Sequence, residues 1–223
     1  MAFTDFYFNN IMNDKNYCII MAGGIGSRFW PLSKDNYPKQ FLDVLGTGKS
    51  FIRSTYERFS PLIPDGNFLV VTNAAYKGLV LQHLPELKPE QVLCEPARRN
   101  TAPCIAYATY RIKAQCDNAN IVVTPADHLV TNEREFQRIV SQGFSFLRDN
   151  GNALLTIGIR PSRPETGYGY IEVAKQDPLP DVAKVTMFKE KPAGTLFPLG
   201  NISLGNSSGI FLFPESAFFF ASY

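Results

Sequence analysis

Residues 21–41, MAGGIGSRFWPLSKDNYPKQF, combine glycines and cations in a pattern that predicts chemistry. Closely spaced glycines let the backbone approach an anion, and their amide groups can form an anion-binding nest. Arg28 and Lys39 add full positive charges to the same segment. An ordinary turn would explain the glycines but not the cations, whereas a bound triphosphate with a clamped leaving group explains both. The residues expected to hold phosphates through this loop are Ala22, Gly23, Gly24, Gly26 and Ser27.

Two better-known glycine loops do not fit the sequence. A dinucleotide-binding fingerprint needs a third glycine where this chain has Phe29, and Pro31 and Pro38 interrupt the helix that should follow. Residues 46–50, GTGKS, end like a phosphate-binding P-loop. However, the first glycine of that motif is replaced by Asp43, and no strand directly precedes it. We therefore interpret residues 46–50 as a turn before a helix.

The rest of the chain alternates between strand and helix patterns. Short apolar runs predict buried strands at residues 17–22, 68–71, 91–94, 120–124 and 153–157. Helix patterns predict helices over residues 51–59, 73–83 and 132–150, with Ser50 capping the first and Asn132 capping the last. Another helix, with Pro103 in its first turn, follows the loop at residues 95–103. This alternation predicts a Rossmann-like α/β fold with a mixed, mostly parallel sheet and helices on both faces. Ligands bind such sheets at the carboxyl ends of the strands.

Asp127 follows the strand predicted at residues 120–124 and therefore lies at that edge of the sheet. Mg²⁺ prefers hard oxygen ligands and is usually held by one or two carboxylates together with substrate phosphates. Asp127 is thus the expected Mg²⁺ ligand. We leave the neighbouring His128 out of the metal site, because Mg²⁺ does not favour nitrogen and a hydrogen-bonded structural role explains this histidine.

The loop at residues 95–103, EPARRNTAP, joins a predicted strand to a predicted helix. Arg99, Asn100 and Thr101 are polar groups at this junction, where α/β sheets bind ligands. A helix cap formed by Asn100 or Thr101 is an equally good explanation of those two side chains.

Four ordered motifs resemble those of the sugar-1-phosphate nucleotidyltransferases, and in this form those of the mannose-1-phosphate guanylyltransferases. They are GGIGSRFWPLS followed by PKQF, then EPARRNTAP, PADH and FKEKP. The resemblance implies the nucleotide-diphospho-sugar transferase fold and Mg²⁺ as cofactor. It also implies the transfer of GMP from GTP to α-D-mannose 1-phosphate, which gives GDP-mannose and pyrophosphate.

The same resemblance implies roles for individual residues. Arg28 and Lys39 would be catalytic, and Asp127 would bind the metal. The guanine base and nucleotide would be held with the help of Glu95, Arg99, Asn100 and Thr101. The sugar phosphate would be bound by Gly167, Glu190, Lys191 and Asn206.

The sugar-phosphate residues have simpler alternatives. Residues 166–171, TGYGYI, also fit a plain hairpin, and Glu190 beside Lys191 also fits a solvated surface pair. The segment around Asn206 departs from the family pattern, because Gly205 replaces a tryptophan and one serine is added.

We expect one catalytic domain over residues 1–223. It would consist of a lead-in at residues 1–16, a nucleotide-binding core at 17–157 and a β-rich sugar-binding part at 158–223. The family pattern continues past Tyr223 and includes a second metal-binding aspartate there. We therefore expect the sugar-binding part to be truncated at its C-terminal end.

Composition limits the classes of partner. The net charge of +2 is too small to indicate a nucleic-acid surface, and no apolar stretch is long enough to span a membrane. The four cysteines lack a Cys-x-x-Cys pairing, and the N-terminus lacks a secretory leader, which favours buried thiols and a cytoplasmic protein. The expected partners are GTP and mannose 1-phosphate, with no nucleic acid and no membrane, and a homodimer is compatible with this interpretation.

Two further functions remain open at this level. One is an inactive homologue that senses a nucleotide sugar, and the other is a nucleotidyltransferase for another sugar 1-phosphate. A purely structural module explains the cations and Asp127 at strand ends less well.

Overall fold

The structure, a computed structural model, shows two compact units. It describes residues 14–24, 26, 29–97, 99–151, 153–159, 169–174, 182–189, 210–213 and 219–222. One unit comprises residues 1–155 and 218–223, and the other comprises residues 156–217.

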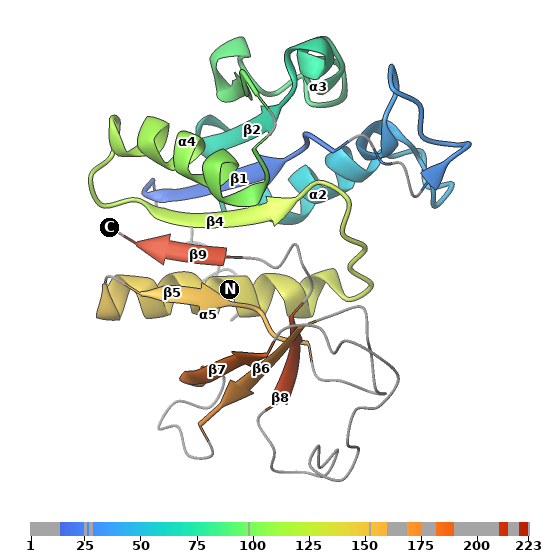
Figure 1. Ribbon diagram of the computed structural model, residues 1–223. Helices are drawn as coiled ribbons and strands as arrows, with labels where there is room; N and C mark the ends of the chain where they lie inside the picture. The colour runs from blue at the N-terminus through green and yellow to red at the C-terminus, as the bar shows by residue number, and fades with distance from the viewer. Residues whose placement is uncertain are drawn as a thin grey trace, which may run out of the picture. The chain divides into compact units, whose positions relative to one another are not determined.

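The first unit contains a six-stranded sheet with the order β3-β2-β1-β4-β9-β5 (Figure 1). Strands β1 to β4 pair in parallel, and β9 pairs antiparallel with β4. The predicted mixed, mostly parallel sheet is therefore confirmed. The strand bounds are β1 (Asn16–Met21), β2 (Phe68–Thr72), β3 (Val92–Cys94), β4 (Asn120–Pro125), β5 (Leu154–Thr156) and β9 (Phe219–Ser222).

Strand β1 lies between two parallel neighbours, and Met21 at its carboxyl end is opposite Val71 and Pro125. The carboxyl ends of β1, β2 and β4 therefore meet at one edge of the sheet. Cys18, Ile19 and Ile20 are fully buried, as expected for a parallel strand that is covered on both faces.

Four α-helices lie within the described residues. Ser50 caps the first by accepting a hydrogen bond from the amide of Arg53 (3.4 Å), and Asn132 caps the last by accepting from the amide of Glu135 (3.1 Å). Both caps agree with the sequence predictions. The helix bounds are α2 (Phe51–Phe59), α3 (Lys77–His83), α4 (Thr101–Lys113) and α5 (Glu133–Asn150), and the 3₁₀ helices are η2 (Lys39–Phe41), η3 (Asp65–Asn67), η4 (Ala74–Tyr76) and η5 (Pro89–Gln91).

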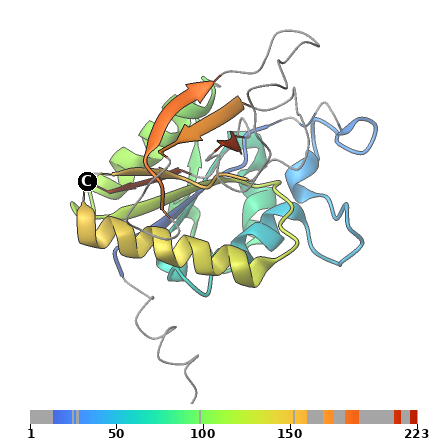
Figure 2. The ribbon, with the colours of Figure 1, turned by 90° about the horizontal axis from the view of Figure 1, so that it is seen from below.

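The helices cover both faces of this sheet. Figure 2 shows α4 on one side of the sheet and α2 and α5 on the other. Ala108 and Ile112 of α4 belong to the same buried cluster as Ile19 of β1. On the opposite face, the Tyr56 ring of α2 contacts the Phe68 ring of β2, with 4.7 Å between their centroids. Burial of each large apolar side chain contributes about 1.5–3 kcal/mol to stability.

Two features of the sheet differ from the sequence analysis. Leu154 of β5 is 80% exposed, so the prediction of another buried strand is wrong at this residue, because β5 lies at the edge of the sheet. Strand β9 was not predicted. Its aromatic residues are typical of strands, but the local sequence does not reveal antiparallel pairing with the distant β4.

The second unit contains a three-stranded antiparallel sheet with the order β7-β6-β8. Tyr170 and Ile171 of its central strand are buried. The β-rich character expected after residue 158 therefore agrees with the described residues. The strands are β6 (Gly169–Val173), β7 (Val185–Lys189) and β8 (Ile210–Phe213).

The cysteines agree with their predicted burial only in part. All four are free thiols; Cys18 and Cys104 are buried, whereas Cys94 and Cys116 are partly exposed. Burial raises the pKa of Cys104 to about 12, with a smaller contribution from the charge of Glu95. Separately, none of the helices in the described ranges has the length and apolar character needed to cross a bilayer.

Candidate active site

The glycine loop begins at Ala22, whose backbone is fixed by three hydrogen bonds. The Ala22 amide donates to the carbonyl of Val71 (2.8 Å). Its carbonyl accepts from Thr72 Oγ1 (2.9 Å) and from Gln40 Nε2 (2.8 Å). Both donor side chains are buried. The loop therefore leaves the carboxyl edge of the sheet in a defined direction.

Gly26 lies against the segment that carries Lys39. It has a positive φ of 66°, which favours glycine. A Cβ atom at this position would be 2.5 Å from Ser33 Oγ and 2.9 Å from Lys39 Cγ. The same segment is held by the Lys39 amide, which donates to Ser33 Oγ (3.0 Å). A glycine is thus needed here for both its conformation and its close packing.

Lys39 and Asp127 form an ion pair between Nζ and Oδ2. Their side chains are 25% and 22% exposed, so ligands could reach both charges. The Lys39 ammonium also lies 5.6 Å from the centre of the Phe29 ring. The structure therefore brings together the lysine and the aspartate that the sequence selected.

Asp127 places a carboxylate just after the carboxyl end of β4. Within the described ranges, no three His, Cys, Asp or Glu side chains gather into a metal centre. A single carboxylate nevertheless fits Mg²⁺, since this ion usually keeps several waters and takes further oxygens from phosphates. Burial lowers the pKa of the neighbouring His128, and the charge of Asp127 opposes this shift. The structural role expected for His128 stays a prediction, because a neutral imidazole suits a structural role and a metal ligand equally.

The second predicted nucleotide-binding segment follows β3 at the same edge of the sheet. A Cβ atom added to Gly23 would lie 3.5 Å from Glu95 Oε2, so this carboxylate is next to the glycine loop. Arg99 and Asn100 are exposed, and Thr101 is the first residue of α4. Asn100 has a φ of 66° and its side chain makes no capping hydrogen bond. The alternative of a cap by the Asn100 side chain is therefore wrong.

The remaining predicted site residues lie outside the described residues, and their placement stays a prediction. They are Ser27, Arg28, Gly167, Glu190, Lys191 and Asn206.

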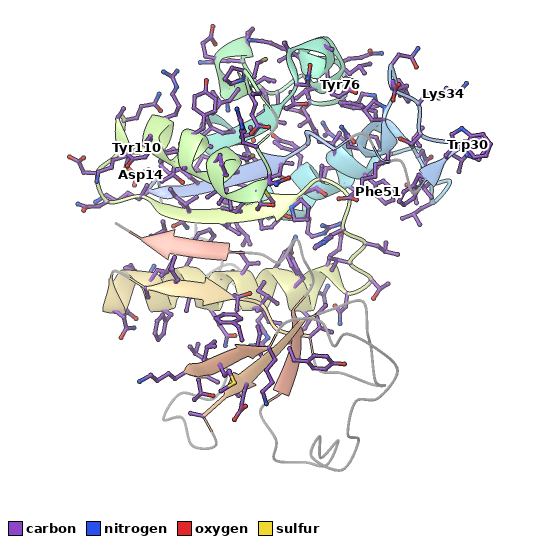
Figure 3. All side chains as sticks on the ribbon, viewed as in Figure 1. Asp14, Trp30, Lys34, Phe51, Tyr76 and Tyr110 are labelled. Carbon is purple, nitrogen blue, oxygen red and sulfur yellow. The ribbon has the colours of Figure 1, made fainter. Side chains whose placement is uncertain are left out.

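The segment between the glycine loop and η2 extends away from the sheet. Figure 3 shows Trp30 and Lys34 at its outer end. Trp30 is 80% exposed, so it does not anchor the segment in the core. The contacts that hold this segment include those of Ser33 and Lys39 beside Gly26 and the hydrogen bond from Tyr76 Oη to the Asp35 carbonyl (2.8 Å).

A carboxylate of the protein occupies the amides of the P-loop-like segment at residues 46–50. The Asp43 carboxylate accepts hydrogen bonds from the amides of Thr47 (3.0 Å) and Gly48 (2.6 Å). Lys49 points to Glu57, with 2.6 Å between Nζ and Oε2. In a P-loop, such amides and the lysine bind phosphates. Because protein carboxylates bind them here, the interpretation of residues 46–50 as a turn before α2 is confirmed.

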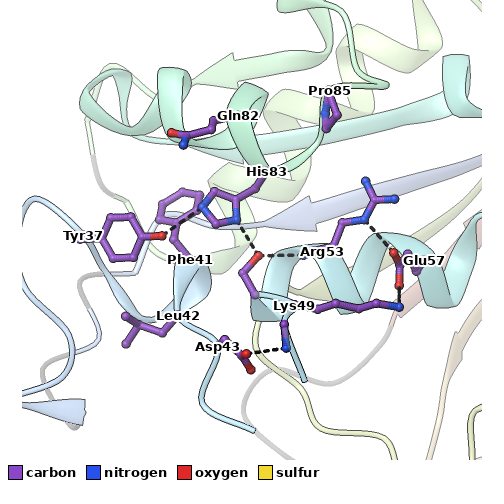
Figure 4. Close-up of a pocket in the computed structure, with 12 residues that line it drawn as sticks. Tyr37, Phe41, Leu42, Asp43, Lys49, Arg53, Glu57, Gln82, His83 and Pro85 are labelled. Carbon is purple, nitrogen blue, oxygen red and sulfur yellow. Dashed lines mark hydrogen bonds and ion pairs between the residues drawn. The ribbon is translucent and has the colours of Figure 1, made fainter. Parts of the chain in front are cut away.

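A cavity of about 560 Å³ lies between this turn, α2 and the end of α3 (Figure 4). His83 connects its walls, because Nδ1 is 2.8 Å from Ser50 Oγ and Nε2 is 3.2 Å from Tyr37 Oη. Burial lowers the pKa of His83. Arg53 forms ion pairs with Glu57 and with a glutamate that follows α3. The charged side chains of the cavity are therefore largely paired with other groups of the protein.

Several residues of the carboxyl edge were missed by sequence reasoning. Gln40 and Thr72 hold the Ala22 carbonyl, and Thr55 and Arg58 of α2 contact the turn around Asp127. Gln40 stands beside Lys39 in the chain, but its sequence position does not show which way its amide points. Contacts between distant segments carry no local sequence signal.

Known proteins support the assignment of most of this chain to one family. The family model described as nucleotidyl transferase matches residues 17–223. Mannose-1-phosphate guanylyltransferase RfbM of Salmonella typhimurium is 38% identical over 208 residues, which cover 90% of this chain and 42% of the relative. Mannose-1-phosphate guanylyltransferase of Escherichia coli is 37% identical over 203 residues, or 87% of this chain and 42% of the relative. The chain thus spans less than half of the length of these curated relatives.

A solved structure supports the same assignment. A crystal structure from Thermus thermophilus, described as a mannose-1-phosphate geranyltransferase, matches with a TM-score of 0.75 and 28% identity. The match covers 92% of this chain and 57% of that protein. With the α/β sheet and the glycine loop at its carboxyl edge, these matches lead to one conclusion: the chain belongs to the nucleotidyl transferase family.

Proposed function

We propose that this chain transfers a guanylyl group from GTP to α-D-mannose 1-phosphate. The observation that carries the proposal is the Lys39–Asp127 ion pair beside Gly26, at the carboxyl edge of the sheet. Phosphoryl transfer depends mainly on positioning and on stabilising charge around phosphorus. A glycine loop, a cation and a carboxylate in one place supply those requirements.

The proposed reaction is an in-line displacement at the α-phosphorus of GTP. An oxygen of the mannose 1-phosphate attacks this phosphorus, and the bond to the bridging oxygen between the α and β phosphates breaks. The products are GDP-mannose and pyrophosphate. No covalent intermediate with the protein is needed.

The described residues take distinct roles in this proposal. The amides of Gly23, Gly24 and Gly26 bind the β and γ phosphates, since this loop follows the sheet edge where ligands bind, whereas the Ala22 amide already donates to the carbonyl of Val71. Lys39 stabilises negative charge near the reacting phosphorus. From the sequence motifs, Arg28 clamps the leaving pyrophosphate and Lys191 binds the sugar phosphate.

Asp127 is the proposed Mg²⁺ ligand. The ion would supply charge neutralisation at the phosphate oxygens. The single carboxylate at this edge is the donor type that Mg²⁺ accepts, with phosphates and waters completing the shell. Lys39 and Asp127 pair with each other in this structure, and this proximity supports one shared site for phosphate and metal.

The choice of guanine and mannose comes from the relatives. The Salmonella and Escherichia coli proteins are both named mannose-1-phosphate guanylyltransferases. The segment with Glu95, Arg99, Asn100 and Thr101 is the proposed base and nucleotide contact, because Glu95 lies next to Gly23. Residues 158–223, with Gly167, Glu190 and Asn206, are the proposed sugar-binding part of a single catalytic domain. A homodimer and a cytoplasmic location stay predictions.

Pyrophosphate release tests the proposed function. The chain is incubated with Mg²⁺, mannose 1-phosphate and each of GTP, ATP, UTP and dTTP in parallel reactions. Release with GTP well above the other nucleotides is expected. Release with another nucleotide would replace guanine in the proposal, and binding of GDP-mannose without release from any nucleotide would favour a sensor.

A further inference from the structure

Two side chains of α2 contact the backbone on either side of Asp127. Thr55 Oγ1 donates a hydrogen bond to the carbonyl of Ala126 (3.1 Å). Arg58 Nη2 donates to the carbonyl of His128 (3.3 Å). Thr55 and Arg58 are three residues apart on the helix, so they project from the same face. One helix therefore holds the carbonyl of the residue before Asp127 and the carbonyl of the residue after it.

The turn is also held from the sheet. The Ala126 amide donates to the carbonyl of Met21 at the end of β1 (3.0 Å). The Asp127 carboxylate then reaches Lys39. Ala126 is thus held through both its amide and its carbonyl, and His128 through its carbonyl, which restricts movement of the turn that carries Asp127.

Burial of the Arg58 charge costs more free energy than a purely structural contact requires. It is only 2% exposed, and its guanidinium lies 5.7 Å from the centre of the Phe136 ring. Within the described residues, its Nε and Nη1 atoms have no hydrogen-bond partner, and Nε is 3.6 Å from Glu133 Oε1. Burial of a charge is costly, and apolar residues of similar volume often replace buried ion pairs without loss of stability.

Glu133 does not explain the burial of Arg58 by itself. Its side chain is 53% exposed, so water can solvate its charge without the arginine. A long apolar residue could pack against Phe136 equally well, but it could not donate to the carbonyl of His128. The hydrogen bond to this carbonyl is thus the contact that a methionine could not replace.

We infer that Thr55 and Arg58 are positioning residues, which hold the turn at residues 126–128 so that the Asp127 carboxylate faces the glycine loop. This inference rests on the proposed role of Asp127 as the Mg²⁺ ligand. Residues that orient a metal ligand through its surroundings change metal affinity or activity by about 10–100-fold when they are replaced.

The test uses Thr55→Val and Arg58→Met, which remove the hydrogen-bond donors but keep similar side-chain shapes. Thr55→Ser and Arg58→Lys are the conservative variants, which keep a donor. Arg53→Met is the matched control, because Arg53 lies on the same helix but pairs with Glu57. Three quantities are measured: hydrogen exchange of the peptide that covers residues 125–130, affinity for Mn²⁺ in the presence of GTP, and the Mg²⁺ concentration that half-activates turnover.

We expect faster exchange of this peptide in Thr55→Val and Arg58→Met. We also expect Mn²⁺ affinity and Mg²⁺ activation to weaken by about 10–100-fold. The conservative variants should recover most of the Mn²⁺ affinity and Mg²⁺ activation, and the Arg53→Met variant should match the wild type. Arg58→Met should keep the unfolding midpoint of the wild type.

Unchanged exchange and unchanged Mn²⁺ affinity in both donor-free variants would overturn the positioning role. The positioning role would also be overturned if both variants lost Mn²⁺ affinity only in proportion to a lowered unfolding midpoint. A wild-type chain without turnover would instead overturn the proposed function, whereas the exchange and Mn²⁺ measurements would still decide the role of the two α2 residues.

Discussion

Lys39 and Asp127 meet as an ion pair, although one follows the glycine loop and the other follows β4. Their contact is possible because β1 and β4 are parallel neighbours, with Met21 opposite Pro125. Both side chains therefore start from the same edge of the sheet. This pair provides the two opposite charges around which the proposed chemistry is arranged.

Replacement of Lys39 by methionine should lower kcat/KM by about 100-fold, because a positioned cation near the reacting phosphorus is lost. The methionine keeps most of the stem that packs beside Gly26. Lys34→Met is the matched control, since Lys34 is an exposed lysine of the same segment. Steady-state pyrophosphate release gives the comparison, and equal losses in both variants would remove Lys39 from the mechanism.

The Asp127→Asn variant should lose turnover by more than about 100-fold, since a ligand of the metal has a larger effect than a residue that only orients one. The fold should be kept, because the Asp127 side chain is partly exposed. Asp117→Asn changes an exposed aspartate before β4 and should have no effect. Turnover at saturating Mg²⁺, together with circular dichroism, checks this, and near-normal turnover in Asp127→Asn would contradict the assignment.

The Gly26→Ala variant should be strained and poorly active. A positive φ costs an alanine about 1–2 kcal/mol. In addition, the new Cβ would collide with Ser33 Oγ and the Lys39 stem. The expected result is a loss of kcat/KM of about tenfold or more, given that small displacements of reacting groups reduce rates strongly. Gly78→Ala is the control, because a Cβ there meets no atom within 4 Å; equal kinetics in the two variants would contradict the packing argument.

Acid should destabilise the protein partly through His83. Burial keeps the pKa of His83 in the folded chain below its ordinary value of 6.5. As the pH falls below about 6.5, the unfolded chain therefore binds the proton first, and the free energy of unfolding decreases until the folded form is also protonated. The ring of His83 is hydrogen-bonded to two neutral hydroxyl groups, Ser50 Oγ at Nδ1 and Tyr37 Oη at Nε2. The nearby charges of Arg53 and Glu57 are paired with each other.

Chemical denaturation between about pH 7.5 and 5 checks this pH dependence. The free energy of unfolding should decrease less in His83→Gln than in the wild type over this range. Contributions from other groups, such as His128, are common to both proteins and cancel in the difference. Parallel curves for the two proteins would show that His83 does not contribute.

The sequence predicted the parts of this structure that depend on local patterns. The apolar runs identified β1 to β4, and the capping residues Ser50 and Asn132 correctly marked two helix starts. Because parallel strands align their carboxyl ends, these local predictions were also sufficient to expect Asp127 near the glycine loop.

The parts that were missed depend on contacts between distant segments. No pattern around Arg58 shows that it is buried, or that it reaches the carbonyl of His128. The same is true of Gln40, whose amide bonds to Ala22, and of β9, whose register with β4 is set by the folded sheet. The exposure of Leu154 likewise follows from the place of β5 at the edge of the sheet, which its sequence does not reveal.

The most direct test of the central claim is ³¹P NMR of the chain with GTP, mannose 1-phosphate and Mg²⁺, run in parallel on the wild type, Lys39→Met and Asp127→Asn. We expect GDP-mannose and pyrophosphate to appear together in the wild type and to be strongly reduced in both variants. Equal formation of GDP-mannose by the three proteins would contradict the claim that the Lys39–Asp127 pair marks the reacting centre.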